Sequence, residues 1–259
     1  MKEHIEPPLP PGLDLLWGRR ERGKKGPKPG LTLNAIVAAA MKVADAEGLR
    51  AVSMARVASE LGFTTMSLYR YVNSKDELLQ LLWNASAAGA PEISGTDWRS
   101  RVESWATAQR NLLSQRRWVL DMPMSGPPAG PNSLAWLEQG MQAFDGTGLS
   151  DDEKLGVLGM VSLYTLGEAR MAADGESASA AGAPPLDFGS LLRTLVDEAE
   201  YPSLHRAAWS GEIDSDLSHD DETADPTFGF GLGLILDGVQ AMIDRKAAST
   251  LKRHPSKSR

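Results

Sequence analysis

The side chains with the clearest chemistry lie between Thr64 and Tyr71, where hydroxyl groups, aromatic rings and one guanidinium follow one another. Threonine and serine reach base edges in the major groove of DNA, and tyrosine and arginine bond to phosphates. Shortly afterwards Lys75 follows a helix-capping serine, and a lysine beside the free N–H groups of a helix start suits a phosphate. The segment predicts DNA binding, and the alternative is a surface helix pair in an ordinary helical bundle.

Two short helices joined by a glycine turn must position these side chains. Ser53 is an N-cap for a first helix over about 53–60, and Leu61-Gly62-Phe63 forms the turn. The second helix is expected over about 64–71, with a threonine as its N-cap. Because a short turn containing glycine lets two helices cross steeply, the second helix stays accessible on one side.

Two longer helices are expected to flank this pair. The first begins after Thr32 and ends at a glycine C-cap, Gly48, although Ala35 three positions on gives no capping box. The second begins with the capping box Ser74 to Glu77, which precedes a leucine-rich run.

The rest of the chain also has helical spacing and no sustained two-residue alternation, so the fold class is all-α. Further helices are expected at roughly 96–116, 131–145, 150–173, 187–199 and 226–248. We expect a basic, Pro/Gly-rich flexible arm at 1–30, a helix-turn-helix DNA-binding domain at 31–85, and a helical ligand-binding and dimerisation domain at 86–259. Residues 210–225 hold seven acids and no Lys or Arg, which indicates a mobile loop.

The charge is divided unevenly along the 259 residues, whose net charge is −7. Residues 1–85 carry 12 basic and 9 acidic side chains, while the remainder carries a net −10. Six of the cations, Arg19, Arg20, Arg22, Lys24, Lys25 and Lys28, lie within ten positions. A basic end on an acidic chain favours contact of that end with DNA phosphates, and a solvated tail is the alternative.

Several function classes are excluded by what the sequence lacks. There is no cysteine, and the four histidines have no metal-ligand spacing, so neither a metal nor a cofactor is expected. Gly18 to Lys25 imitates a phosphate-binding loop but ends in lysine, and no catalytic serine motif occurs, so we expect no enzyme. The apolar run Phe228–Leu236 is too short to span a bilayer, and the N-terminus lacks a signal peptide. We therefore expect a cytoplasmic protein without a membrane partner.

A family resemblance rests on Ile36-Val37-Ala38-Ala39-Ala40, Asp45-Ala46-Glu47-Gly48, Ser53-Met54, Val57-Ala58 and Leu61-Gly62. It rests above all on the run Met66-Ser67-Leu68-Tyr69-Arg70-Tyr71-Val72-Asn73-Ser74-Lys75-Asp76-Glu77-Leu78. Residues 31–83 resemble the DNA-binding domain of TetR-type transcriptional repressors. The rest, through Gly130-Pro131-Asn132, Gly148-Leu149-Ser150-Asp151-Asp152-Glu153 and Phe228-Gly229-Phe230-Gly231-Leu232, resembles the tetracycline-repressor-like C-terminal domain.

The resemblance implies an all-helical homodimer that binds a palindromic DNA operator and is released by a small-molecule effector, here unidentified. By position it puts Thr65, Met66, Tyr69 and Arg70 on the recognition helix, Ser53 and Arg56 on the preceding helix, and Lys75 at a phosphate. The full set of candidate DNA-binding residues is Ser53, Arg56, Thr64, Thr65, Met66, Ser67, Tyr69, Arg70, Tyr71 and Lys75. The alternative is a helical small-molecule-binding or dimerisation protein without specific DNA binding.

Large adaptable side chains in the second domain are suited to line an apolar effector cavity with a few polar contacts. The candidates are Trp83, Trp105, Gln109, Met122, Asn132, Trp136, Gln139, Met160, Tyr164 and Glu168. For any single large residue, plain core packing is the more frequent alternative. Small residues in the helices near 150–173 and 226–248 favour a dimer interface formed by these two helices, with packing inside one subunit as the alternative.

Overall fold

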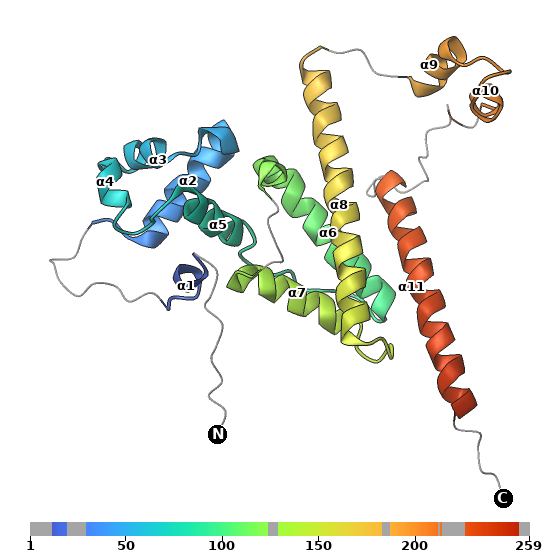
Figure 1. The fold of residues 1–259 in the computed structure, drawn as a ribbon, viewed down its shortest axis with the longest axis horizontal. Coiled ribbons are helices and arrows are strands. Elements are labelled where there is room, and N and C mark those ends of the chain that lie inside the picture. The colour runs from blue at the N-terminus through green and yellow to red at the C-terminus, as the bar shows by residue number, and fades with distance from the viewer. Residues whose placement is uncertain are drawn as a thin grey trace, which may run out of the picture. The chain divides into compact units, whose positions relative to one another are not determined.

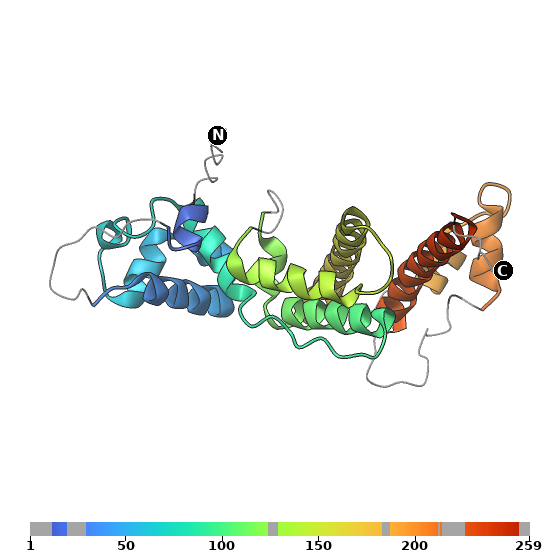
Figure 2. The same cartoon turned by 90° about the horizontal axis from the view of Figure 1, so that it is seen from below.

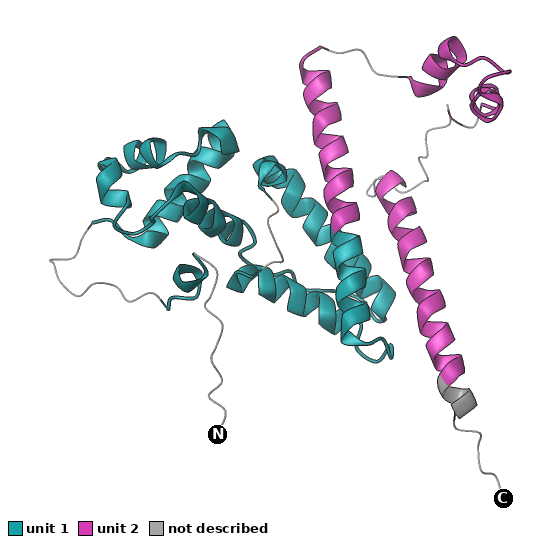
Figure 3. Cartoon of the chain, viewed as in Figure 1, with its two compact units in different colours: residues 1–162 teal, residues 163–259 magenta. Residues whose placement is uncertain are grey.

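The structure is a computed structural model, which describes residues 12–19, 30–123, 129–182, 187–211, 213 and 226–253. In these ranges the regular elements are helices and no strand occurs, which confirms the all-α class (Figure 1). The chain divides into two compact units, residues 1–162 and 163–259 (Figure 3). None of the described helices combines the length and the hydropathy of a membrane span.

The first unit contains four helices and one short 3-10 turn that pack around a common core. They are α2 (Leu33–Glu47), η1 (Leu49–Ala51), α3 (Met54–Leu61), α4 (Thr65–Leu68) and α5 (Lys75–Ser86). We call helices α2 to α5 the reader. Each of the four helices contributes fully buried side chains, and Val72 adds another between α4 and α5. The helical ones are Ile36, Val43, Val57, Leu68, Leu78 and Leu82. Leu68 alone anchors the short helix α4, so the other α4 side chains face outward or sideways.

Side-chain caps fix where three of the reader helices begin. The hydroxyl oxygens of Thr32, Ser53 and Ser74 each accept the N–H three residues on, at 3.1 Å. The cap at Thr32 therefore forms without a capping box. At the start of α5, the Glu77 carboxylate accepts the N–H of Asn73 at 2.5 Å, one residue earlier than a standard capping box places it.

A left-handed glycine makes the turn between α3 and α4. Gly62 has φ +71 and ψ 26, which side chains other than glycine rarely adopt. The N–H of Phe63 bonds back to the carbonyl of Ala58 at 3.0 Å and so closes α3. α4 is shorter than the helix expected to Tyr71. Beyond its end, Tyr71 and Val72 still bond to the carbonyl of Leu68, at 2.8 and 3.0 Å.

The rest of the first unit consists of α6 (Trp98–Gln115), the 3-10 turn η2 (Arg117–Asp121), α7 (Pro131–Ala143) and the first part of α8 (Asp151–Ala180). We call these the effector helices. α6 and α7 lie side by side in both views (Figures 1 and 2). They approach closely because Gly140 has no side chain: a Cβ there would lie 2.7 Å from Leu158 and 3.1 Å from Trp105.

The second unit holds the remainder of α8 together with α9 (Phe188–Leu195), α10 (Pro202–Trp209) and α11 (Pro226–Arg253). Tyr164 of α8 stacks on Phe228 of α11, with ring centroids 5.5 Å apart. Its hydroxyl lies 2.9 Å from the carbonyl oxygen of Phe228. α9 and α10 are joined by a hydrogen bond from Arg193 to the carbonyl of Ala208, at 2.8 Å.

Three features differ from the sequence-based expectations. A short helix, α1 (Leu13–Leu16), lies inside the segment expected to be a flexible arm, because its side chains pack on other elements. α8 continues past 173 to Ala180, and α10 was not expected. The boundary between the two units falls inside α8. The domain boundary expected near residue 85 stays a prediction. Most of the expected acidic loop at 210–225 lies outside the described residues.

Candidate DNA interface and effector domain

α4 presents an outer face that rises from its buried anchor Leu68. Met66 is 72% exposed and Tyr69 is 42% exposed. Arg70 is exposed too, and Thr65 is half-buried. A thioether, a phenol and a guanidinium thus share one surface, which offers apolar contact to a thymine methyl and hydrogen bonds to phosphates.

Other candidate residues on and around α4 are engaged within the protein. The hydroxyl oxygens of Thr64 and Ser67 lie 3.0 Å apart, within hydrogen-bond distance of each other. The Tyr71 hydroxyl donates to the carbonyl oxygen of Leu31 at 2.9 Å, which ties the end of α4 to the residues before α2. Tyr71 is half-buried, and its hydroxyl holds the residues after α4 in place through the bond to Leu31 rather than facing outward with Met66 and Tyr69.

Lys75 is the first residue of α5 and is exposed. Its neighbour Ser74 uses its hydroxyl to cap the helix, so the ammonium group stands at the end of α5 whose N–H groups point outward. The positive end of the helix dipole and the lysine charge reinforce each other there. This end of α5 can hold a phosphate.

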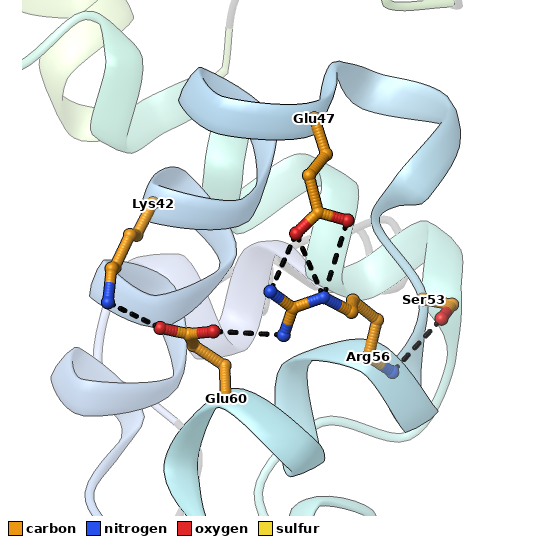
Figure 4. A network of polar contacts seen from close by, with 5 residues as sticks. All are labelled: Lys42, Glu47, Ser53, Arg56 and Glu60. Atoms are coloured by element: carbon orange, nitrogen blue, oxygen red, sulfur yellow. Dashed lines mark hydrogen bonds and ion pairs between the residues drawn. The ribbon is translucent and has the colours of Figure 1, made fainter.

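Arg56 on α3 lies in a network of charges that joins α3 to α2 (Figure 4). Its guanidinium contacts the Glu47 carboxylate at 2.6 Å and the Glu60 carboxylate at 2.9 Å. Lys42 contacts the other oxygen of Glu60 at 2.6 Å. The hydrogen bonds to Glu47 and Glu60 raise the pKa of Arg56, and the hydrogen bonds from Lys42 and Arg56 lower the pKa of Glu60.

This network bears on two candidate DNA contacts, Arg56 and Ser53, because both side chains already have partners within the protein. The Arg56 guanidinium is already paired with two carboxylates, and the Ser53 hydroxyl accepts the N–H of Arg56 as the cap of α3. Both side chains therefore hold α3 in place in the described structure. Glu47 lies nine positions before Arg56 and Glu60 lies four positions after it. Only the i, i+4 pair with Glu60 could be predicted from sequence, because residues four apart are neighbours on a helix.

Two aromatic candidates for effector binding, Trp105 and Trp136, are buried in the core of the first unit. Trp105 is fully buried, and its indole N–H donates to the carbonyl oxygen of Trp136 at 2.9 Å. The indole N–H of Trp136 in turn donates to the carbonyl of Ala87, just after α5, at 2.9 Å. Met122 is buried as well, and Trp83 is half-buried. These side chains make core contacts and link the effector helices to the reader.

The polar candidates are spread more widely. Gln109 donates to the Ser162 hydroxyl at 3.3 Å. Asn132 and Asn84 make two hydrogen bonds, at 2.9 and 2.8 Å, that join α7 to α5. Gln139 is half-buried on α7. Tyr164 and Glu168 belong to the second unit, and Met160 is 60% exposed on α8. The assignment of the ten candidates to one effector site stays a prediction.

A cavity of about 1030 Å³ lies elsewhere in the first unit, beside α1, α2 and α5. Asn132 is the one effector candidate that lines this cavity. Asn84 and Arg116, which are not candidates, line it too. Asp45 also lines it and accepts the indole N–H of Trp118 at 2.6 Å. These hydrogen-bond pairs, Asn84 with Asn132 and Asp45 with Trp118, cannot be predicted from local sequence, since the partners lie 48 and 73 positions apart.

One buried group in the effector helices was also missed. The hydroxyl of Ser133 is buried on α7 and has no hydrogen-bond partner. It lies on the buried face of α7 that also carries Trp136 and Gly140. A buried serine cannot be told from a surface serine by sequence alone, because residue type does not report burial.

The basic stretch ahead of α2 falls mostly outside the described residues. Only Arg19 of its six cations is described, and it is exposed. The other five lie outside the described residues, and their contact with DNA stays a prediction.

Comparison with known proteins places the chain in a family. Residues 36–82 match the model of bacterial regulatory proteins of the tetR family, and residues 90–243 match the model of the tetracyclin repressor-like C-terminal domain. The chain therefore belongs to the TetR family of transcriptional regulators.

Individual relatives agree with this assignment. The chain is 34% identical to the HTH-type transcriptional repressor DrrR1 of Streptomyces coeruleorubidus over 245 residues, covering 90% of this chain and 86% of that protein. It is 31% identical to an HTH-type transcriptional regulator of Saccharopolyspora erythraea, over 73% of this chain and 79% of the relative. Among solved structures, ActR of Streptomyces coelicolor in complex with actinorhodin has a TM-score of 0.67 and 28% identity, covering 82% of this chain and 96% of ActR.

Proposed function

We propose that this protein is a homodimeric repressor that binds a palindromic DNA operator through the reader and leaves it when an apolar aromatic effector binds. The observation that carries the proposal is the exposed face of α4 on a helix-turn-helix of the TetR family. The protein acts in the cytoplasm, where the DNA is, and has no catalytic role.

The base-facing contacts are assigned to α4. Met66 meets a thymine methyl, and Thr65 lies beside it at the start of the helix. Tyr69, Arg70 and Lys75 bond to phosphates. Thr64 and Ser67 share the groove-facing side as a hydroxyl pair, whereas Ser53, Arg56 and Tyr71 hold the reader in shape.

The dimer is proposed to form through α8 and α11, which carry apolar side chains outside any core. Met160 and Leu163 on α8 are 60% and 62% exposed, and Phe230 and Leu234 on α11 are 65% and 59% exposed. A Cβ on Gly159 would meet no atom within 4 Å. Exposed apolar helix faces with small residues permit close approach of a second copy.

The first experiment selects bound sequences from random DNA at physiological salt. We expect a palindromic consensus with half-sites about one helical turn, roughly 34 Å, or a multiple of it apart. Absence of any consensus, at low salt as well, would contradict the repressor and favour the alternative, a helical dimer that binds small molecules without specific DNA binding.

The second experiment addresses the effector. ActR, similar to this chain over most of its length, binds actinorhodin, so actinorhodin is the first probe. We expect it to raise the melting temperature in proportion to the logarithm of its concentration and to release the selected DNA. A rise in melting temperature without release would leave the protein a small-molecule binder but not a ligand-controlled repressor.

A further inference from the structure

α1 lies outside the reader in sequence but packs on it. Leu15 and Leu16 are half-buried and line the cavity of about 1030 Å³. The opposite wall comes from α2 and α5 and includes Val37, Met41 and Leu81. Gly12, at the start of α1, is buried against the side chain of Gln80 on α5.

The same short helix also reaches the effector helices. The indole N–H of Trp17 donates to the carbonyl oxygen of Ala129, two residues before α7, at 3.0 Å. α1 therefore shares a cavity with α2 and α5, meets α5 at Gly12 and is bonded to the chain entering α7. All of these contacts lie within the first unit.

The entry to α7 is also where α5 is already held. Asn132 donates two hydrogen bonds to Asn84, from its backbone N–H to the side-chain oxygen and from its side-chain amide to the backbone carbonyl, and a Cβ on Gly130 would overlap the Asn84 side chain. α1 reinforces this junction with a second attachment that comes from a different part of the chain. Any rotation of α5 relative to α7 has to carry α1 along or break the bond from Trp17.

We propose that α1 is a positioning element for DNA binding, holding the reader at a fixed angle to α7 through Leu15, Leu16 and Trp17. The inference rests on the proposed function, because the angle matters only when two readers of a dimer must meet two half-sites together. The two halves of a palindrome are recognised at one spacing when the readers are held rigidly. Weakening the contacts of α1 should therefore make the dimer less selective for one half-site spacing.

Leu15 and Leu16 are half-buried beside an open cavity, and Trp17 is 43% exposed. Substituting them therefore removes contacts of α1 without opening the buried core of the reader. The test uses the full chain with two variants, L15S/L16S and W17F. W17F keeps the ring and deletes the N–H that bonds to Ala129. The matched control is W209F, since Trp209 is 52% exposed on α10 and stacks on His205 in the second unit.

Each protein is titrated with the selected operator and with operators whose half-site spacing is one base pair longer or shorter. For L15S/L16S we expect affinity for the native spacing to fall about three- to tenfold, and the penalty for altered spacing to shrink by a similar factor. For W17F we expect both the affinity and the spacing penalty to fall, but by a smaller factor than for L15S/L16S. W209F behaves as wild type.

A folded L15S/L16S protein with wild-type affinity and an unchanged spacing penalty overturns the inference. Equal weakening at every spacing also overturns it, since that result assigns α1 a role in stability alone. If wild type selects no operator, the proposed function fails instead. Hydrogen exchange then tests α1 separately: α2 and α5 must lose protection in L15S/L16S, and unchanged protection overturns the attachment itself.

Discussion

At the scale of single residues, the candidate DNA surface separates into side chains that face outward and side chains already bonded inside the protein. Met66, Tyr69, Arg70 and Lys75 are exposed. Arg56 is paired with two carboxylates, and Tyr71 bonds to Leu31. The outward group is expected to bind DNA directly, and the inward group to act through the shape of the reader.

The outward group gives a prediction about sequence preference. Lys75→Ala removes a phosphate contact, so binding weakens about equally on all sequences and the salt slope falls by about 1. Met66→Ala removes a contact to one base, so preference at a single position relaxes, by roughly tenfold or less. Titrations at several salt concentrations on operators with single base changes measure both. The same pattern from both variants would contradict the division of roles.

The inward group gives a prediction about pH. Bonds from Lys42 and Arg56 lower the pKa of Glu60 below 4.5, its ordinary value. The ionised carboxylate therefore adds stability above that value, and the contribution disappears as pH falls through the lowered pKa. Glu60→Gln lacks this contribution at every pH. Urea unfolding should show wild type more stable than Glu60→Gln at pH 7, with the difference narrowing below about pH 4.

The control for this measurement is Glu198→Gln, at an exposed glutamate in the second unit. It should leave stability near wild type across the range. A Glu60→Gln deficit that stays constant from pH 7 to pH 3 would contradict the proposed role of the ion pairs.

At the scale of elements, helix starts and turns follow from local sequence, and the contacts between helices do not. The caps at Thr32, Ser53 and Ser74 and the glycines after α2 and α3 are signals within four residues, and the structure confirms them. α1 was missed because four residues make no stable helix alone. It forms where Gly12 and Trp17 reach α5 and Ala129.

The effector helices show the same limit. The sequence names Trp105 and Trp136 as large apolar side chains of the effector helices. It does not decide whether they line a ligand cavity or pack in the core. In the structure Trp105 bonds to the backbone of Trp136, and the two fill a core. For these two residues the structure agrees with the alternative of core packing, and the apolar effector cavity expected from the sequence stays a prediction.

The close approach of α7 to α6 and α8 at Gly140 predicts how the substitution Gly140→Ala, which adds one methyl group, changes the stability. In an exposed helix Gly→Ala stabilises by about 1 kcal/mol. At Gly140 the new Cβ would lie 2.7 Å from Leu158 and 3.1 Å from Trp105, both fully buried. Overpacking of this kind costs about 1–3 kcal/mol, so Gly140→Ala should lower the free energy of unfolding. Gly156→Ala on α8, where nothing lies within 4 Å, is the control and should not destabilise the monomer.

At the scale of the whole molecule, the exposed apolar side chains of α8 and α11 predict assembly. Met160→Glu places a carboxylate on a face that is 60% exposed in one protomer and buried in the proposed dimer. An unpaired charge buried in an interface costs about 2–5 kcal/mol, so the dimer should dissociate at least tenfold more readily. Light scattering reports the mass directly, and operator binding should fall with it.

Leu195→Glu on α9 is the matched control, because Leu195 is 67% exposed and lies on neither helix of the proposed interface. It should keep the mass and the DNA affinity of wild type. Dissociation by Leu195→Glu with none by Met160→Glu would move the interface to α9.

The junction between the reader and the effector helices carries a consequence for observing the protein. Two indole N–H groups are bonded across it, Trp118 to Asp45 at 2.6 Å and Trp136 to Ala87 just after α5 at 2.9 Å, and a third, Trp17, bonds nearby to Ala129 at 3.0 Å. Indole fluorescence responds to hydrogen bonding and to water around the ring. Part of the emission of the seven tryptophans therefore comes from indoles at this junction, and a change in their hydrogen bonds on binding of DNA or effector changes that part without an attached dye.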